Sequence, residues 1–434
     1  MRSADFCWIL TIIMCCWSCN QEKMDVWKAG IEVATDTIDC KLVLGEPCQG
    51  MLMVEKDVDL GHRLCCLPKD ITLCFKGGII KNGTLVGDGT KIDNTGVCFD
   101  KVRILGTWIV PEISTSMFRD LNYDNSLKDV VALSNPKVYN KIVIERGDYQ
   151  VSAQHPGDVC LHLFGNTEII LNGTVRMVPN NYRHYYIFRM RGENIRMTGN
   201  GTIIGDKHTH TGETGEWGMG IDVLNTRNVT ISGLNVKDCW GDCIYVGEKA
   251  TNILIENCRL DNGRRQGISI TGSYWVNVRN CIITNVAGTD PEYAIDVEPN
   301  KGETTEHVTI EDVTVKDCKG GIKVYGRAID ARVGTVIVKN CRIDAEKKEP
   351  IAAAQCDTMI VENSTIIQRD GWGCIACKDV GYVTINDNTL WYDKGVFYQL
   401  KDWVRPMFDK KRIKFMDIEN CGAVTIVRNK ESNL

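Results

Sequence analysis

Five short segments between residues 217 and 325 decide the fold: WGMGIDV (217–223), WGDCIYV (240–246), RRQGISI (264–270), EYAIDVE (292–298) and KGGIKVY (319–325). Each segment has apolar side chains at alternate positions around one outward residue, which is the period of a β-strand. The first apolar positions recur at spacings of 23, 24, 27 and 27 residues: Ile221, Ile244, Ile268, Ile295 and Ile322. A strand that recurs at this period predicts a solenoid whose coils stack on one another.

A second pair of columns precedes the next strand of each coil and supports the same stack. One column holds small or apolar residues, which predicts a buried ladder: Leu234, Cys258, Cys281, Val313, Cys341, Ser364 and Asn388. The column just before it holds residues that tolerate a left-handed backbone: Gly233, Asn257, Asn280, Asp312, Asn340, Asn363 and Asp387. Cysteine alternates with leucine, valine and serine in the first column, so the 21 cysteines are interpreted as largely free, buried thiols.

The outward residues of the opening segments gather on one face of the predicted stack. One column reads Asp222, Tyr245, Ser269, Asp296 and Lys323, and then Ala352 and Ala376. Another, two positions before each first buried isoleucine, reads Met219, Asp242, Gln266, Tyr293 and Gly320. Acidic, basic and aromatic side chains thus share one face, and the first column changes to alanine in the later coils. This contrast is the strongest functional signal in the sequence.

Composition and charge narrow the choice of partner. The net charge is −5, and no basic run is present, which argues against nucleic acid because phosphate binding needs a Lys/Arg surface.

An apolar run ends at Cys16-Trp17-Ser18-Cys19 and resembles a bacterial lipoprotein signal, with Cys19 as the lipidated residue. A plain cleaved signal and a membrane anchor are the alternatives. We therefore expect an extracytoplasmic protein, anchored by lipid at a bacterial outer membrane or cell surface, or otherwise periplasmic or secreted.

The predicted organisation follows the chain. A signal peptide (1–19) and a linker (20–37) precede N-terminal β coils and a cap (38–150), in which strands are expected at 41–45, 50–60, 71–78, 79–92 and 102–108. Residues 125–133 predict a short helix capped by Asp124 or Asn125, and residues 141–151 predict a strand. The β-helix that carries the expected active face spans 151–390, and a C-terminal coil and cap span 391–434.

The mixture of side chains on the outward face is typical of a cleft for a sugar polymer. Paired carboxylates can run acid–base hydrolysis, and we expect Asp242 and Asp296 to form this pair, with Glu298 in reserve. The two aspartates lie two coils apart, roughly 8–11 Å at the backbone. The expected substrate-binding residues supply aromatic faces and charged groups: Glu216, Trp217, Trp240, Arg264, Arg265, Gln266, Lys323 and Tyr325.

Three motifs carry a family resemblance: GDCI (241–244), QGISI (266–270) and GIK (321–323). They are similar to the polygalacturonase-type glycoside hydrolases of the pectate-lyase-like superfamily, which the chain resembles from about Cys40 onward. Asp242 and Lys323 match that family, whereas Gly241, Gln266, Gly321 and Met219 stand where it has aspartate, histidine, arginine and a further aspartate. The resemblance implies an all-β, single-stranded, right-handed parallel β-helix with a short N-terminal capping helix, acting on a polysaccharide.

Hydrolysis of an acidic or surface polysaccharide is therefore the preferred function, with two alternatives. One is β-elimination on a uronate, in which Arg265 or Lys323 serves as the base and Gln266 helps to neutralise the carboxylate. The other is glycan binding or adhesion without catalysis. No cofactor is the preferred prediction, because His208 and His210 lie in a Gly/Thr-rich loop that is more typical of a plain loop than of a metal site. A Ca²⁺ held by Asp242, Asp296 and Glu298 is the less favoured alternative, since no Asp-rich Ca²⁺ loop accompanies these carboxylates.

Overall fold

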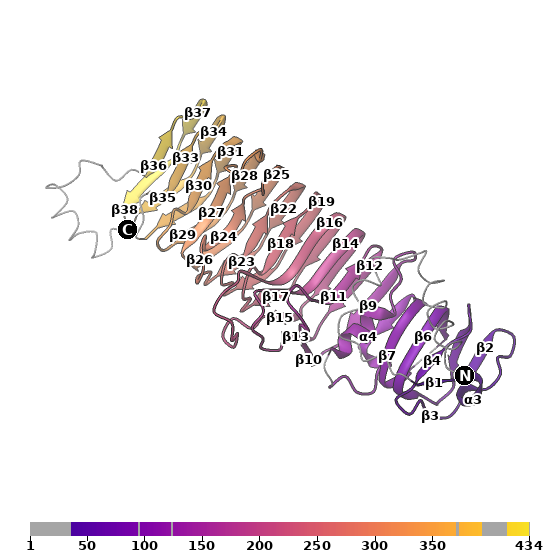
Figure 1. The fold of residues 1–434 in the computed structure, drawn as a ribbon. Coiled ribbons are helices and arrows are strands. Elements are labelled where there is room, and N and C mark those ends of the chain that lie inside the picture. Colours follow the sequence, from indigo (N-terminus) through magenta and orange to yellow (C-terminus); the bar gives the residue numbers. More distant parts are fainter. Residues whose placement is uncertain (1–35, 94–95, 123–124, 370–372, 393–414, 434) are drawn as a thin grey trace. The chain divides into compact units, whose positions relative to one another are not determined.

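The computed structural model describes residues 36–93, 96–122, 125–369, 373–392 and 415–433. The predicted signal peptide, Cys19 and nearly all of the predicted linker lie outside the described residues. The chain divides into two compact units, Met1–Val138 and Tyr139–Leu434 (Figure 1). Within the described ranges, no helix is long and apolar enough to cross a membrane.

The first unit is built on one sheet of parallel strands, all of which pair directly or indirectly with β6. A further short strand, β8 (Glu112–Ser114), leads into a 3-10 turn at Thr115–Met117. The seven strands of the sheet are β1 (Thr37–Ile38), β2 (Met51–Val54), β3 (Val58–Asp59), β4 (Leu64–Cys66), β5 (Thr72–Phe75), β6 (Ile80–Asp93) and β7 (Phe99–Ile109).

Two helices accompany this sheet, and one of them corrects a prediction. Residues 41–45 were expected to form a strand, but α3 (Cys40–Leu44) is a helix. Its buried residues, Cys40 and Leu44, lie four positions apart on one helical face, and the Asp39 side chain caps it by accepting a hydrogen bond from the Lys41 N–H at 2.9 Å. The predicted second helix is confirmed as α4 (Ser126–Ala132). Its expected cap is not formed by a side chain, because Asn125 adopts a left-handed backbone without a capping hydrogen bond; Asp124 lies outside the described residues.

The second unit is a solenoid in which every strand pairs in parallel with its counterpart in the next coil, so the predicted fold class is confirmed (Figure 1). Each coil contributes to a first row, a second row and a third sheet; β14 (His184–Gly199) and β16 (Trp217–Ser232) run through both rows, which therefore form one bent sheet. The other strands of the first row are β11 (Val159–Phe164), β18 (Ile244–Gly247), β21 (Ile268–Ile270), β24 (Tyr293–Val297), β27 (Gly320–Tyr325), β30 (Ile351–Ala354), β33 (Ile375–Lys378) and β36 (Met416–Glu419).

The second row and the third sheet complete each coil. The strand predicted at 141–151 is two strands, β9 and β10, because the chain turns at Arg146-Gly147. The remaining strands of the second row are β9 (Asn140–Ile144), β12 (Thr167–Leu171), β19 (Ala250–Glu256), β22 (Ser273–Arg279), β25 (Thr304–Glu311), β28 (Arg332–Lys339), β31 (Cys356–Glu362), β34 (Tyr382–Asn386) and β37 (Ala423–Val427). The third sheet comprises β10 (Asp148–Val151), β13 (Thr174–Met177), β15 (Thr202–Ile204), β17 (Asn235–Lys237), β20 (Arg259–Asp261), β23 (Ile282–Thr284), β26 (Thr314–Cys318), β29 (Arg342–Ala345), β32 (Thr365–Gln368), β35 (Thr389–Tyr392) and β38 (Lys430–Asn433).

The register confirms the predicted columns. Ile221, Ile244, Ile268, Ile295 and Ile322 pair in that order, and all are fully buried. The cysteine-containing ladder is buried, and its cysteines, Cys258, Cys281 and Cys341, are free thiols. Every member of the ladder from Gly233 to Asp387 has a positive φ, as the residue types predicted. Asn280 donates to the Asn257 side chain at 2.5 Å, so this ladder is bonded along the stack.

A second asparagine ladder, which the sequence analysis did not identify, lies at another corner of the coils. Asn166, Asn194, Asn228 and Asn252 all have a positive φ. Their side-chain amides bond from coil to coil at 3.2, 3.1 and 2.8 Å. The two ladders hold the corners of neighbouring coils together. They therefore help to fix the register that positions the outward columns.

Candidate functional site

The first row places the predicted outward columns residue against residue. Asp222 pairs with Tyr245, Tyr245 with Ser269, Ser269 with Asp296, and Asp296 with Lys323. These side chains point away from the core of the stack, yet Asp222, Ser269 and Asp296 are almost fully covered. The columns are therefore not a solvated face. Their polar groups meet one another.

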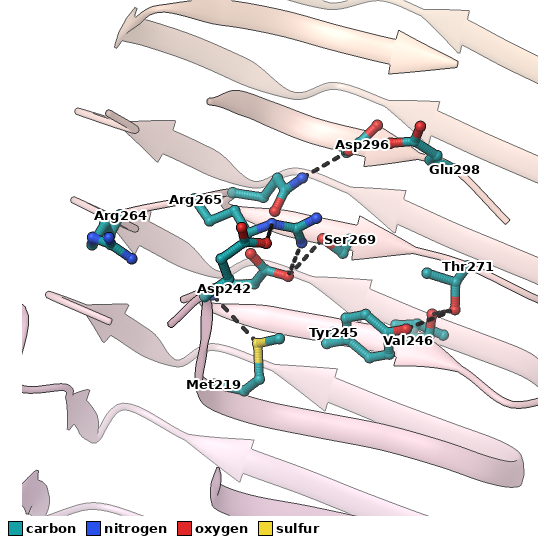
Figure 2. Close-up of polar contacts among 12 residues, drawn as sticks. Met219, Asp242, Tyr245, Val246, Arg264, Arg265, Ser269, Thr271, Asp296 and Glu298 are labelled. Carbon is teal, nitrogen blue, oxygen red and sulfur yellow. Dashed lines mark hydrogen bonds and ion pairs between the residues drawn. The ribbon is translucent and has the colours of Figure 1, made fainter. Parts of the chain in front are cut away.

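Asp242 lies at the bottom of this cluster and has no exposed surface. Its Oδ2 accepts a hydrogen bond from Ser269 Oγ at 2.7 Å and lies 3.3 Å from Arg265 Nη1 (Figure 2). Its Oδ1 is buried and accepts no hydrogen bond from any described residue. Burial raises the pKa of Asp242 to about 6, against the opposing effects of Arg265 and Ser269.

Asp296 and Glu298 form the second acidic group, two positions apart along the chain. Gln266 Nε2 donates to Asp296 Oδ2 at 2.7 Å, and Lys323 Nζ lies 3.8 Å from Asp296 Oδ1 and 2.6 Å from Glu298 Oε2. Burial raises the pKa of Asp296 to about 7, and the Glu298 carboxylate adds to the rise while Lys323 opposes it. The Glu298 side chain is 38% exposed, so this pair joins a buried acid to an accessible one.

Arg265 forms an ion pair with Asp242 (Figure 2). Its guanidinium contacts Asp242, and its Nε lies 3.5 Å from Glu216 Oε2. Asp296 and Glu298 also act on it electrostatically. Asp242 Oδ1, Gln266 Oε1, Asp296 Oδ1 and Arg265 Nε are all buried without a hydrogen-bond partner among the described residues. Such groups are costly unless satisfied, and their concentration at one place is typical of a functional site.

The two tryptophans predicted to stack on sugar differ in access. Trp217 is 45% exposed, so part of its side chain is accessible to a ligand. Trp240 is buried, with the His210 ring stacked 3.9 Å from its ring centroid and the Arg264 guanidinium 3.8 Å from it. Because one ring has only two faces, these neighbours occupy both. In this conformation both faces of Trp240 are covered and none is open for a sugar, while Arg264 lies with one face on Trp240.

Two functional candidates on this face were not found from the sequence. Arg189 of β14 pairs in register with Asp222, and its Nε lies 2.5 Å from Asp222 Oδ2. The alternation in YYIFRMRG (185–192), one coil earlier, was a signal that could have revealed it. Arg327 follows β27 and lies 4.1 Å over the ring of Tyr325. No periodic pattern marks that loop, so Arg327 could be located only in the structure.

A groove of about 290 Å³ adjoins Lys323 on the side of the later coils. Its floor is the alanine column, since Lys323 pairs with Ala352 and Ala352 with Ala376. The small alanine side chains therefore leave a groove that continues the outward face beyond Lys323. The groove is lined by Tyr293, Lys323, Tyr325, Arg327, Glu349, Ala352, Ala353, Ala354, Ala376, Cys377, Lys378, Asp417 and Glu419.

The two loop histidines do not converge on a common site. His208 Nε2 lies 3.1 Å from Asp238 and its side chain is exposed, whereas His210 is buried with Nδ1 2.9 Å from Asp206. In the part of the chain that the structure describes, no group of three or more histidine, cysteine or acidic side chains is arranged to hold a metal ion.

Comparisons with known proteins agree with this fold. The family model described as "Right handed beta helix region" matches residues 149–302 and 300–433. An uncharacterized protein, YclG, of Bacillus subtilis is 32% identical over 192 residues, which cover 37% of this chain and 32% of that protein. YorA, an uncharacterized prophage-derived protein of the same organism, is 28% identical over 199 residues, covering 40% and 34%. The matched part thus spans about a third of each relative's length.

Solved structures resemble the chain at low sequence identity. The A-module of mannuronan C-5 epimerase AlgE6 from Azotobacter vinelandii is 12% identical, with 71% of this chain and 94% of that chain covered and a TM-score of 0.49. An exopolygalacturonase from Thermotoga maritima is also 12% identical, with 65% and 87% covered and a TM-score of 0.43.

Proposed function

Because this chain belongs to the right-handed β-helix family, and because ionisable side chains gather on one face of its helix, we propose that it cleaves a polysaccharide by acid–base chemistry. The observation that carries the proposal is the Asp296–Glu298 pair around Lys323. One carboxyl is buried with its pKa near neutrality, and the other is accessible and ion-paired. Glycoside hydrolysis needs two carboxyl groups in opposite protonation states.

The roles of the pair follow from their surroundings. With its pKa raised to about 7 by burial, Asp296 retains a proton near neutral pH and can donate it to a leaving oxygen. Glu298, paired with Lys323 at 2.6 Å and partly exposed, serves as the ionised partner that activates water or attacks the sugar. Glu298 directly follows β24, and its carboxylate and that of Asp296 both lie near Lys323 Nζ, so both groups face one substrate.

Asp242 serves this site indirectly. Its Oδ2 is held by Ser269 and Arg265, so we assign Asp242 to fixing Arg265, which in turn offers a cation near both acidic groups. This changes the assignment expected from the sequence, in which Asp242 was half of the acid–base pair. Arg265, Gln266 and Lys323 remain the groups best placed to orient an acidic substituent.

Space for the neighbouring sugars lies on both sides of the pair. The groove over Ala352 and Ala376 receives the chain beyond Lys323, with the Tyr325 edge on its rim. Towards the earlier coils, Trp217 presents an exposed ring. A polymer running along the stack axis would therefore cross Asp296 and Glu298 between these two contacts, which supports an action within a polysaccharide rather than on a small molecule.

The test is a screen of acidic and neutral glycans, reading new reducing ends and unsaturated products together. With a substrate found, Glu298→Gln and Asp296→Asn should each lower kcat by about 100-fold or more. Asp344→Asn is the matched control, because Asp344 is a buried aspartate bonded to Arg369 at 2.6 Å on the third sheet. Unchanged turnover in both site variants would refute the assignment.

The same screen separates the two alternatives. A lyase that uses Arg265 or Lys323 as its base would release an unsaturated product that absorbs in the ultraviolet, whereas a hydrolase would not. A binding or adhesion protein would retain glycan without any product after long incubation. The raised pKa of the buried Asp296 favours hydrolysis, because binding alone has no use for a protonated acid.

Export and lipid anchoring through Cys19 complete the proposal. They rest on the N-terminal sequence alone. The whole chain expressed in a bacterial host should partition with membranes, and Cys19→Ser should release it into the soluble fraction. Equal partitioning of both proteins would contradict the lipid anchor at this residue.

A further inference from the structure

An insertion between the third sheet and the first row, residues 205–215, packs against the site from one side. It connects β15 to β16 and begins and ends with glycine. Gly215 has a φ of +121°, and a Cβ there would lie 2.4 Å from the Arg183 carbonyl oxygen, so only glycine fits. The insertion therefore has a defined exit angle into Glu216 and Trp217.

The base of the insertion is fixed by a buried carboxylate. Asp206 is 1% exposed and accepts hydrogen bonds from the Tyr185 hydroxyl and from the backbone and side chain of Asn180 at 3.2 and 3.0 Å. His210 Nδ1 lies 2.9 Å from Asp206 Oδ2, the oxygen that also accepts both hydrogen bonds from Asn180. Lys207 extends the anchorage to later coils, donating to Asn262 at 2.5 Å.

The insertion then touches Arg264, and the residue that follows it touches Arg265. His210, whose side chain has no exposed surface, stacks on one face of Trp240, and Arg264 covers the other. At the far end, Arg264 Nη1 donates to the Gly215 carbonyl oxygen at 2.8 Å, and the next residue, Glu216, pairs with Arg265 at 3.5 Å. The loop thus holds Arg264 directly, and its exit fixes the Glu216 that holds Arg265.

We propose that residues 205–215 are a positioning loop for the arginine pair, and that His210 is its key positioning residue, acting through Trp240 and Arg264 on Arg265. The effect of the loop on catalysis rests on the function proposed above, whereas its positioning of the arginine side chains does not. Without the His210 ring, one face of Trp240 would lose its packing and Asp206 one of its partners. Arg264 would then lose a rigid surface to lie on, and Arg265 would hold Asp242 and Glu216 less firmly.

Two histidines in one loop provide a matched test. His210→Ala removes the stack, His210→Phe keeps a ring over Trp240 without the bond to Asp206, and His208→Ala changes an exposed histidine that touches neither arginine. The first readout is amide hydrogen exchange of residues 264–266 in the whole protein without substrate. These amides are informative because Arg264 and Arg265 donate to the Cys239 and Gly241 carbonyls.

We expect His210→Ala to accelerate exchange at 264–266 by at least about tenfold, with His208→Ala unchanged and His210→Phe close to the wild type. Wild-type exchange in His210→Ala would overturn the proposal, and so would equal acceleration in His208→Ala. If His210→Ala loses protection throughout the chain, His210→Phe decides: fast exchange confined to 264–266 in that variant would also overturn the stacking role.

A second readout links the loop to the reaction. On the glycan that the screen identifies, His210→Ala should lower kcat by about tenfold with a smaller change in KM, and His210→Phe should restore most of it. If the wild-type protein turns over no glycan, the proposed function fails, but the exchange experiment still decides the role of the loop. If turnover is present and His210→Ala leaves kcat unchanged, the loop does not position catalytic groups.

Discussion

Replacing Arg265 by methionine should make the stability of this protein depend steeply on pH above 6. Methionine keeps an unbranched apolar stem but removes the cation 3.3 Å from Asp242 Oδ2. The ion pair at this distance is worth about 5 kcal/mol at an effective dielectric constant of 20. That is the cost of leaving Asp242 ionised and unpaired in its buried position.

Protonation limits this cost near neutral pH. In the wild type the pKa of Asp242 is about 6, above its unfolded value of about 3.9, so the folded state holds a proton that the unfolded state releases, and this group lowers stability as pH rises from about 4 to 6. Without Arg265 the pKa rises further and the loss continues. The added destabilisation is about 1.4 kcal/mol at pH 7 and about 2.7 kcal/mol at pH 8, towards the ceiling of about 5 kcal/mol.

Urea denaturation at pH 6, 7 and 8 measures this slope as the difference between the wild type and Arg265→Met. Arg265→Met in an Asp242→Asn background is the control, since it has no carboxylate at this position and should lose most of the slope. Asp296 adds a contribution of the same sign that the control retains. A stability difference that stays constant from pH 6 to pH 8 would refute the electrostatic account of this pair.

Three further predictions concern other parts of the stack. Asn228→Ala should be less stable than Asn228→Gly by about 1 kcal/mol, because the position has a φ of +59° and both variants lose the same ladder bonds; the reverse order in urea melts would contradict this. In the folded protein, a thiol reagent should label the exposed Cys48 but not the buried Cys258, as mapped by mass spectrometry, with labelling of Cys258 only after denaturation. Ala352→Trp should fill the groove and raise KM for the substrate by about tenfold with little change in kcat; unchanged KM would mean that the groove binds no sugar.

The repeating features of this fold could be predicted from the sequence because they depend on local rules. The pairing of Ile244 with Ile268 was predictable because both the strand periodicity and the coil length can be read from the sequence. Asn257 and Asn280 were predictable as left-handed positions, since few residue types other than glycine tolerate that backbone. The direction of the outward columns followed from the same alternation.

The features that interrupt the repeat could not be predicted in this way. Alternation indicates that Asp242 points away from the core, but not that Arg265 and Ser269 cover it. Trp240 was expected to be available for sugar, yet its two faces are taken by an insertion and by a neighbouring coil. The helix at Cys40–Leu44 resembled a strand because five residues are too few to distinguish the two periods. In the first two cases the outcome depends on contacts between segments far apart in the chain.

The contacts of the candidate site run between coils, so deletion of one coil can change the site while the fold is kept. Deleting residues 268–294 would remove one whole coil and bring Ile295 to the place of Ile268, so the apolar ladder and the corners would continue unbroken. Asp296 would then stand where Ser269 now bonds to Asp242. A shortened chain of this kind should still stack, but two acids would meet where one acid and a hydroxyl lay. In this protein the number of coils determines the length of the stack, and their order determines its chemistry.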